Sequence, residues 1–241
     1  EDPRDALEDA ERVHIVLSDD HAVDALLERI APAIPRSAIV VDHTTVAPQP
    51  TATRCERLEA QGVEFLHAPV FMGPQSCREG SGMMMAAGPR GRFERMEAAL
   101  AAMTGNLWYV GERNDKAAAL KLLGNNMIFF MSAGLADGYN MMRAVNLDPM
   151  EAFELFEHFK VGNSVQFRGK AMAEGKFTPV SFELTMARKD ARLMQETAEN
   201  GGLRLAALPA IGARMDELIA QGRGSEDFTI IGADPRVKAA R

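Results

Sequence analysis

An ammonium group and an amide lie one helical turn apart in an otherwise apolar stretch of the chain. Lys121 and Asn125 have the spacing i, i+4 within the segment ALKLLGNNMIFFMSAGLADG, and this spacing places both side chains on one face of a helix. A desolvated lysine has a lowered pKa and can exchange protons with a substrate that the amide orients. The alternative is a lysine whose aliphatic stem carries its charge out to water.

Two threonine hydroxyls follow a predicted buried strand. The segment AIVVDHT ends in Asp42, His43 and Thr44, and Thr45 comes next. Ligands of open α/β sheets bind beyond the carboxyl ends of the strands, so these hydroxyls are candidates for contact with a cofactor or a substrate. The alternative is a turn in which they cap the helix that begins near Pro48.

Two further polar stretches interrupt the predicted structure. After the segment EFLHAPV, Gly73 permits close approach of the backbone, and successive N–H groups beside it suit an anion. The alternative there is a simple connection between two strands. Farther along, Lys189 and Asp190 interrupt an amphipathic helix, and an exposed ion pair is the default for such neighbours.

Composition argues against several other classes of protein. The net charge is −7 and no long basic block occurs, which argues against a nucleic-acid partner. The five histidines show no metal-ligand spacing, so we expect no metal. Cys55 and Cys77 form no CxxC pair and are expected to be reduced thiols of a cytoplasmic protein. No uninterrupted apolar run reaches the roughly 18 residues of a membrane span, so we expect no membrane partner.

Short apolar runs alternate with helical segments through the first half of the chain. The runs predict strands over residues 12–18, 38–44, 64–70, 82–88 and 107–111. Helices are predicted between them, and Asp19 or Asp20 is the expected cap of the first helix. Strands that alternate with helices form βαβ units, so we expect a parallel sheet that is covered on both faces.

The second half of the chain predicts helices only. They span residues 114–143, 149–159, 164–174, 181–201 and 208–221, with Asn114 as the expected N-cap of the first. An α/β domain of residues 1–112 is therefore expected to precede an all-α domain of residues 113–241. The motif G-x-G-x-x-G, which opens dinucleotide-binding domains between a strand and a helix, does not occur in that context.

In this order, the polar stretches resemble the β-hydroxyacid dehydrogenase family. That family includes 3-hydroxyisobutyrate dehydrogenases, tartronate semialdehyde reductases and glyoxylate/succinic semialdehyde reductases. Its patterns D-x-S-T, D-A-P-V-S-G-G, K-x-x-x-N and K-D are matched by residues 42–45, 67–73, 121–125 and 189–190. The opening ERVHIVLSDDHAVDALL and the ending GRGSEDFTIIG are also similar, so the likeness spans nearly the whole chain.

The resemblance implies an α/β fold, with a Rossmann-like parallel sheet followed by an all-α domain and a long interdomain helix. It implies an oxidoreductase that transfers a hydride between the nicotinamide of NAD or NADP and a small β-hydroxy acid or semialdehyde. Lys121 would be the general acid and base, and Asn125 would orient the substrate beside it. The family's helix packs at domain and subunit interfaces, so the resemblance also implies a homodimer or homotetramer.

The resemblance also assigns residues to the cofactor and the substrate. Leu17, Ser18 and Thr45 would lie along the dinucleotide, and Lys189 would lie near its nicotinamide end. The family's Ser-Gly-Gly, which grips the substrate carboxylate, is replaced here by Phe71, Met72 and Gly73. This replacement removes a hydroxyl and adds bulk, so the substrate is expected to differ from a simple hydroxyisobutyrate.

The sequence also leaves two alternative functions open and predicts that the chain contains only part of the family's fold. The first predicted strand resembles the family's fourth, so we expect the chain to be a fragment of a complete dehydrogenase. One alternative is a non-catalytic or truncated family member that acts as a binding or scaffold protein. Another is an enzyme like 6-phosphogluconate dehydrogenase, which is disfavoured because that family has a histidine at the position of Gly124.

Overall fold

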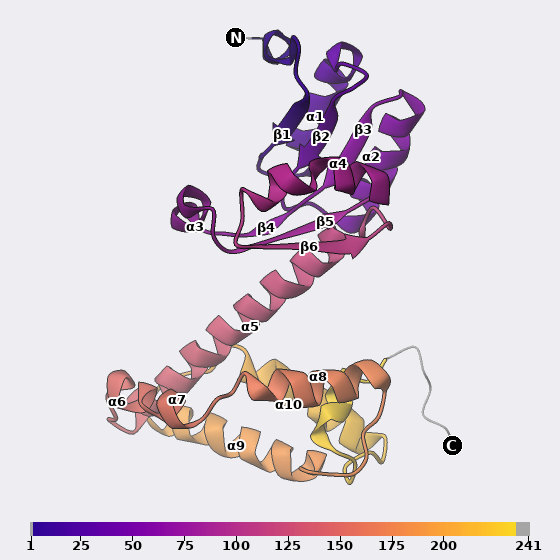
Figure 1. Cartoon of the computed structure of the whole chain (residues 1–241). Helices are drawn as coiled ribbons and strands as arrows, with labels where there is room; N and C mark the ends of the chain where they lie inside the picture. Colours follow the sequence, from indigo (N-terminus) through magenta and orange to yellow (C-terminus); the bar gives the residue numbers. More distant parts are fainter. Residues whose placement is uncertain (1, 235–241) are drawn as a thin grey trace. The chain divides into compact units, whose positions relative to one another are not determined.

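The protein has two compact units, which are seen in the computed structural model of the chain (Figure 1). The structure describes residues 2–234. The units are Glu1–Met127 and Ile128–Arg241. The last strand ends at Gly111, close to the predicted domain boundary, whereas the compact units meet later, within the helix Lys116–Ala144. That long helix therefore contributes residues to both units.

The first unit is built around a six-stranded sheet with the order β1-β2-β3-β5-β4, in which β6 also pairs with β5. The strands are β1 (Arg12–Ile15), β2 (Ile39–Asp42), β3 (Glu64–His67), β4 (Val70–Phe71), β5 (Met83–Ala87) and β6 (Asn106–Gly111). The pairs β1–β2, β2–β3 and β5–β6 are parallel, as expected.

The sheet is mixed because β5 runs antiparallel to both β3 and β4. The predicted strand over 64–70 is two strands, and Pro69 lies between them, where it has no N–H for a ladder bond. The chain then reverses through the short helix α3 (Pro74–Glu79). This connection is too short for a parallel crossover, which needs a dozen or more residues.

The other regular elements of the described chain are helices. The α-helices besides α3 are α1 (Asp20–Ile30), α2 (Pro48–Ala60), α4 (Arg90–Ala101), α5 (Lys116–Ala144), α6 (Pro149–Phe153), α7 (Leu155–His158), α8 (Asn163–Glu174), α9 (Leu184–Asn200) and α10 (Leu208–Ala220). Short 3-10 helices are η1 (Pro3–Leu7), η2 (Ala31–Ala33) and η3 (Phe228–Gly232). The predicted helix over 149–159 is thus two short helices, α6 and α7.

Both faces of the sheet are covered, as predicted. Successive strand residues point to opposite faces, so Val40 packs with Leu58 of α2, whereas Val41 packs with Phe93 of α4. The first helix, α1, covers the same face as α2 and is capped by Asp19, whose carboxylate accepts from the N–H of Ala22.

The N-cap prediction for the long helix α5 is wrong. The helix begins at Lys116, and the N–H of Ala119 donates to the carbonyl of Asp115. Asp115 therefore occupies the N-cap position, because the carbonyl of that residue accepts the first intrahelical bond. The side-chain oxygen of Asn114 is buried and accepts no hydrogen bond within residues 2–234.

The core of the second unit lies between α9, α10 and η3. Its buried side chains are Leu184, Ala187, Ala191, Met215, Leu218 and Ile230. Asp227 holds this core to the start of α9, because its carboxylate accepts from the N–H groups of Ser181 and Phe182. Burial opposes ionisation of Asp227, but these and other hydrogen bonds outweigh it and lower the pKa of the carboxyl.

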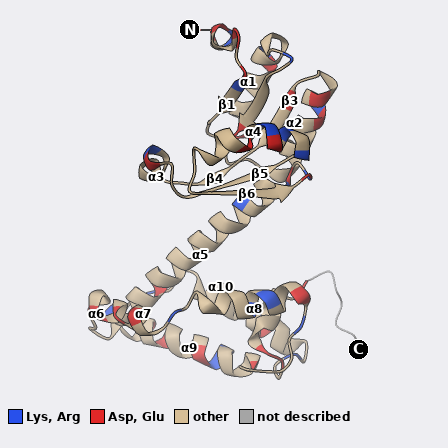
Figure 2. Ribbon diagram, viewed as in Figure 1, with Lys and Arg blue, Asp and Glu red and all other residues tan. Residues whose placement is uncertain are grey.

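The central part of α5 carries few charges and is mostly exposed. No Lys, Arg, Asp or Glu occurs between Lys121 and Asp137, and this part of the helix is drawn without charged residues in Figure 2. By length and composition alone, α5 is apolar enough to cross a membrane. One helix of this length and composition does not establish a membrane span, because core helices of soluble proteins reach the same length and hydropathy.

Candidate active site

The ammonium of Lys121 is buried against an aromatic ring. Lys121 lies in the part of α5 that belongs to the first unit, and the residue is only 8% exposed. Its Nζ atom lies 3.8 Å from the centroid of the Phe71 ring. Within residues 2–234, no carboxylate pairs with it. Burial lowers the pKa of Lys121 below the ordinary value, which favours a role in proton exchange.

The other residues predicted to contact substrate are Asn125, Met72 and Gly73. Asn125 is half-buried one turn further along α5. Met72 is half-buried and Gly73 is exposed, immediately after β4 and before α3. The structure therefore brings Phe71 directly onto Lys121, with Asn125 one helical turn away. No hydrogen bond or ion pair joins Met72 or Gly73 to Lys121 in the described residues.

Three hydrogen bonds hold Thr44 at the end of β2. Its N–H donates to Oδ1 of Asp42 at 2.9 Å, and its Oγ1 accepts from the N–H of Leu17 at 3.0 Å. Nε2 of His67 lies 3.0 Å from its carbonyl oxygen. The alternative that this hydroxyl caps α2 is therefore wrong: it accepts from Leu17, and the N–H of Ala47 at the start of α2 donates to Oδ2 of Asp20 instead.

The residue after this anchored threonine faces outward. Thr45 is exposed between buried Thr44 and buried Val46. Leu17 and Ser18 are also exposed, directly after β1, and the bond from Leu17 to Thr44 joins the carboxyl ends of β1 and β2. These three exposed residues thus lie at the sheet edge where open α/β folds bind their ligands.

The predicted pair in the second unit is exposed. Nζ of Lys189 lies 2.7 Å from Oδ1 of Asp190, and the two side chains are 44% and 39% exposed. This is the default arrangement for such neighbours. The assignment of Lys189 to the nicotinamide end of a cofactor stays a prediction.

Comparisons with known proteins support the resemblance. Residues 1–111 match the family described as the NAD binding domain of 6-phosphogluconate dehydrogenase. The chain is 25% identical to L-threonate dehydrogenase of Cupriavidus necator over 203 residues, which are 83% of this chain and 68% of that protein. It is 28% identical to 3-hydroxyisobutyrate dehydrogenase of Pseudomonas aeruginosa over 140 residues, 58% of this chain and 45% of that protein.

These matches support the β-hydroxyacid dehydrogenase family for this chain. A solved structure is also similar: an imine reductase variant of Myxococcus stipitatus in complex with NAD+ matches with a TM-score of 0.86. That match has 17% sequence identity and covers 95% of this chain and 81% of the other, so it reports on the fold alone.

The family carries an NAD-binding domain, and the first unit of this chain is such a domain for NAD or NADP. Leu17, Ser18 and Thr45 are exposed at the carboxyl ends of β1 and β2, and hydrogen bonds of Thr44 fix the backbone beside them. No group of three or more His, Cys, Asp or Glu residues suited to a metal ion occurs within the described range 2–234.

A buried polar layer beneath this edge was missed by sequence reasoning. The side chain of Arg54 is fully buried and lies 2.9 Å from carboxylate oxygens of both Asp20 and Asp24. Burial lowers the pKa of His67, whose ring contacts the Thr44 loop. The sequence does contain a signal: Asp20 and Asp24 share one face of α1, and Arg54 precedes buried Leu58 by one turn of α2.

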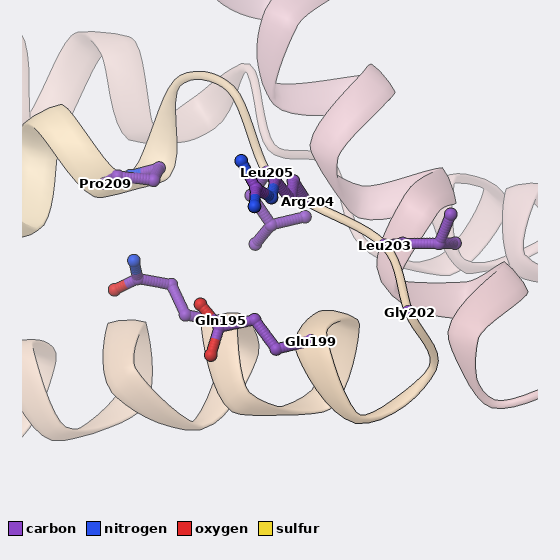
Figure 3. Close-up of a pocket in the computed structure, with 7 residues that line it drawn as sticks. All are labelled: Gln195, Glu199, Gly202, Leu203, Arg204, Leu205 and Pro209. Atoms are coloured by element: carbon purple, nitrogen blue, oxygen red, sulfur yellow. The ribbon is translucent and has the colours of Figure 1, made fainter.

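A separate pocket occurs in the second unit. It has a volume of about 610 Å³ and lies between α9 and the segment that leads into α10. Figure 3 shows Gln195 and Glu199 from α9 pointing toward the segment that contains Arg204 and Leu205. None of the residues predicted to bind substrate or cofactor lines this pocket.

Proposed function

We propose that this family member catalyses hydride transfer between the nicotinamide of NAD or NADP and a small β-hydroxy acid or semialdehyde. Lys121 is the general acid and base. The observation that carries the proposal is a lysine that is 8% exposed and has no carboxylate partner within residues 2–234. A buried charge without a hydrogen-bonding or charged partner costs several kcal/mol, and a bound substrate would supply that partner.

In the direction of reduction, Nζ of Lys121 donates a proton to the carbonyl oxygen of the substrate. In the direction of oxidation, the neutral amine accepts that proton from the hydroxyl group. When it is bound, the cofactor supplies or accepts the hydride. The lowered pKa of Lys121 supports both roles, because a proton-exchanging group works best with a pKa close to the working pH.

The other predicted residues bind and orient. Asn125 holds the substrate one helical turn from Lys121, and residues 71–73 line the substrate side. Leu17, Ser18 and Thr45 hold the dinucleotide at the edge of the sheet, and Lys189 lies near its nicotinamide end. The exposure of the three edge residues supports the cofactor assignment, and the match to an NAD-binding domain supports it independently.

Replacement of one lysine tests the proposal. Lys121→Ala should lower kcat for the reduction of glyoxylate, succinic semialdehyde or methylmalonate semialdehyde by about 100-fold or more, the usual contribution of a general acid. Oxidation of NADH and NADPH is followed by absorbance. Lys116→Ala, at the start of the same helix, is the matched control and should keep its activity. Equal activity in Lys121→Ala and the control would reject the assignment of the proton donor.

A non-catalytic binding protein is the second candidate. The observation in its favour is the aromatic ring of Phe71 at the position where the family has a serine that binds the substrate. Flat absorbance traces with every substrate and both cofactors, from protein that binds NADH or NADPH, would support this candidate over the enzyme.

We also propose that the protein is a homodimer or homotetramer in the cytoplasm. Apolar side chains that the chain leaves exposed on α5 support an assembly. The two cysteines support a reducing compartment, because Cys55 is buried and free and Cys77 is exposed and free.

A further inference from the structure

The ring of Phe71 is held in one position beside the ammonium of Lys121. Nζ lies 3.8 Å from the ring centroid, which is within the range of a cation–π contact. β5 pairs with β4 and places Phe71 opposite Met83. The ring also packs against a buried apolar cluster, which consists of Met85, Ala87, Val110 and Ala117. Strand pairing and packing together therefore keep this ring over the lysine.

Gly124 makes room for the ring. A Cβ atom at this position would lie 2.3 Å from Cζ and 2.9 Å from Cε1 of Phe71. Atoms in a packed interior do not approach so closely, so any side chain at position 124 would push the ring away. Gly124 follows Lys121 by three residues and lies on the same side of α5. If the ring were displaced, it would therefore also lose its contact with the ammonium of Lys121.

We propose that Phe71 and Gly124 are a matched pair that positions Lys121 and selects carbonyl substrates with an apolar group beside the reacting carbon. This inference rests on the proposed function and names the substrate class. An aromatic ring donates no hydrogen bond to a carboxylate, whereas the hydroxyl of a serine at this position would donate one. An alkyl or aryl substituent instead gains apolar contact on the ring.

The reaction itself is the one proposed above. The carbonyl carbon gains the hydride of NADH or NADPH, and the carbonyl oxygen gains the proton of Lys121. The products are an alcohol and NAD+ or NADP+, and a proton from water restores the ammonium. Semialdehydes and keto acids that carry an alkyl or aryl group beside the reacting carbonyl are the predicted substrates.

The geometry of the pair is tested without any activity measurement. In full-length protein with ¹³Cε-labelled lysine, the ring current of Phe71 should shift the ε-CH₂ signal of Lys121, which is assigned by its loss in Lys121→Met. Phe71→Leu and Gly124→Ala should both return the signal to the position of an ordinary lysine. Gly134→Ala is the matched control, because a Cβ there meets nothing within 4 Å. If the ε-CH₂ signal of Lys121 keeps its position in Gly124→Ala, the proposal that Phe71 and Gly124 together position Lys121 is wrong.

The selectivity is tested with two substrates that differ in the group beside the carbonyl. The natural protein should reduce phenylpyruvate with a kcat/KM about tenfold or more above that for glyoxylate, a ratio that apolar contacts can supply. Phe71→Ser should lower this ratio about tenfold, whereas Phe71→Leu should keep the apolar preference.

The outcomes separate this inference from the proposed function. A natural protein that favours glyoxylate, or a ratio that Phe71→Ser leaves unchanged, overturns the inference and leaves the dehydrogenase activity standing. A protein that reduces no carbonyl compound at all overturns the proposed function and, with it, the selectivity. The lysine signal still decides whether the pair positions Lys121.

Discussion

At the scale of single residues, the burial of Lys121 predicts a characteristic pH dependence. The reduction needs the ammonium and the oxidation needs the amine. Because burial lowers the pKa below the ordinary 10.5, kcat/KM for reduction should fall as the pH rises through that lowered value. Over the same range, kcat/KM for oxidation should rise. Both profiles are measured with one substrate pair across neutral to alkaline pH.

Lys121→Arg is the control for this assignment. The guanidinium stays protonated over the whole range, so any remaining reduction should show no fall at the pH where the natural protein loses activity. A fall at the same pH in Lys121→Arg would assign the titration to another group. If kcat/KM of the natural protein changes only at or above pH 10.5, the ordinary pKa of lysine, burial does not lower the pKa of Lys121.

At the scale of elements, a carboxylate of one helix caps another. Asp137 of α5 accepts hydrogen bonds from the N–H groups of Ala206, Ala207 and Leu208 at 2.6, 2.9 and 2.9 Å. Burial opposes ionisation of Asp137, but these bonds outweigh it and lower the pKa of the carboxyl. Asp137→Ala should therefore lower the free energy of unfolding at neutral pH by about 2 kcal/mol, as expected for a lost cap.

Acid should remove the same stabilisation. The pKa of Asp137 is lower in the folded protein than in the unfolded chain. Its contribution to the free energy of unfolding is therefore complete at a pH above the pKa of the unfolded chain. It is lost as the pH falls through the pKa of the folded protein. Urea unfolding at neutral and acidic pH measures both effects. Asp216→Ala is the control, because this exposed carboxylate pairs only with Arg188 in the described residues and should cost about 0.5 kcal/mol or less. Equal losses of the free energy of unfolding in the two variants would show that Asp137 does not stabilise the protein by capping α10.

At the scale of the whole molecule, exposed apolar side chains on α5 predict self-association. Phe129, Phe130 and Met131 are 70%, 55% and 62% exposed, and soluble monomers rarely leave so much contiguous apolar surface in water. The protein should therefore sediment as a dimer or tetramer at micromolar concentration. Phe129→Asp should weaken this assembly by about tenfold or more, because it would bury an unpaired charge.

Phe129→Leu is the matched control for that experiment. It keeps an apolar side chain at the same position, so its assembly should differ little from that of the natural protein. Analytical ultracentrifugation without detergent measures all three proteins. A monomeric natural protein would contradict the prediction, and protein recovered only from the membrane fraction would instead favour a membrane role for α5.

Local patterns in the sequence determined the elements of this protein. The alternation of apolar runs with amphipathic segments predicted β1, β2, β5, β6 and the helices α1, α2 and α4, because hydrophobic periodicity is a property of neighbouring residues. The spacing of Lys121 and Asn125 likewise predicted one shared helix face. The family resemblance, which comparison confirmed, rested on the order of four short motifs.

Only the tertiary structure decided which distant residues meet. The ring of Phe71 reaches Lys121 because β4 turns back along β5 in an antiparallel register, and Gly124 matters only once that ring lies against it. The capping of α10 by Asp137 has the same origin. Such contacts join segments that are far apart in the chain, and their register depends on the packing of the whole unit, so no local pattern predicts them.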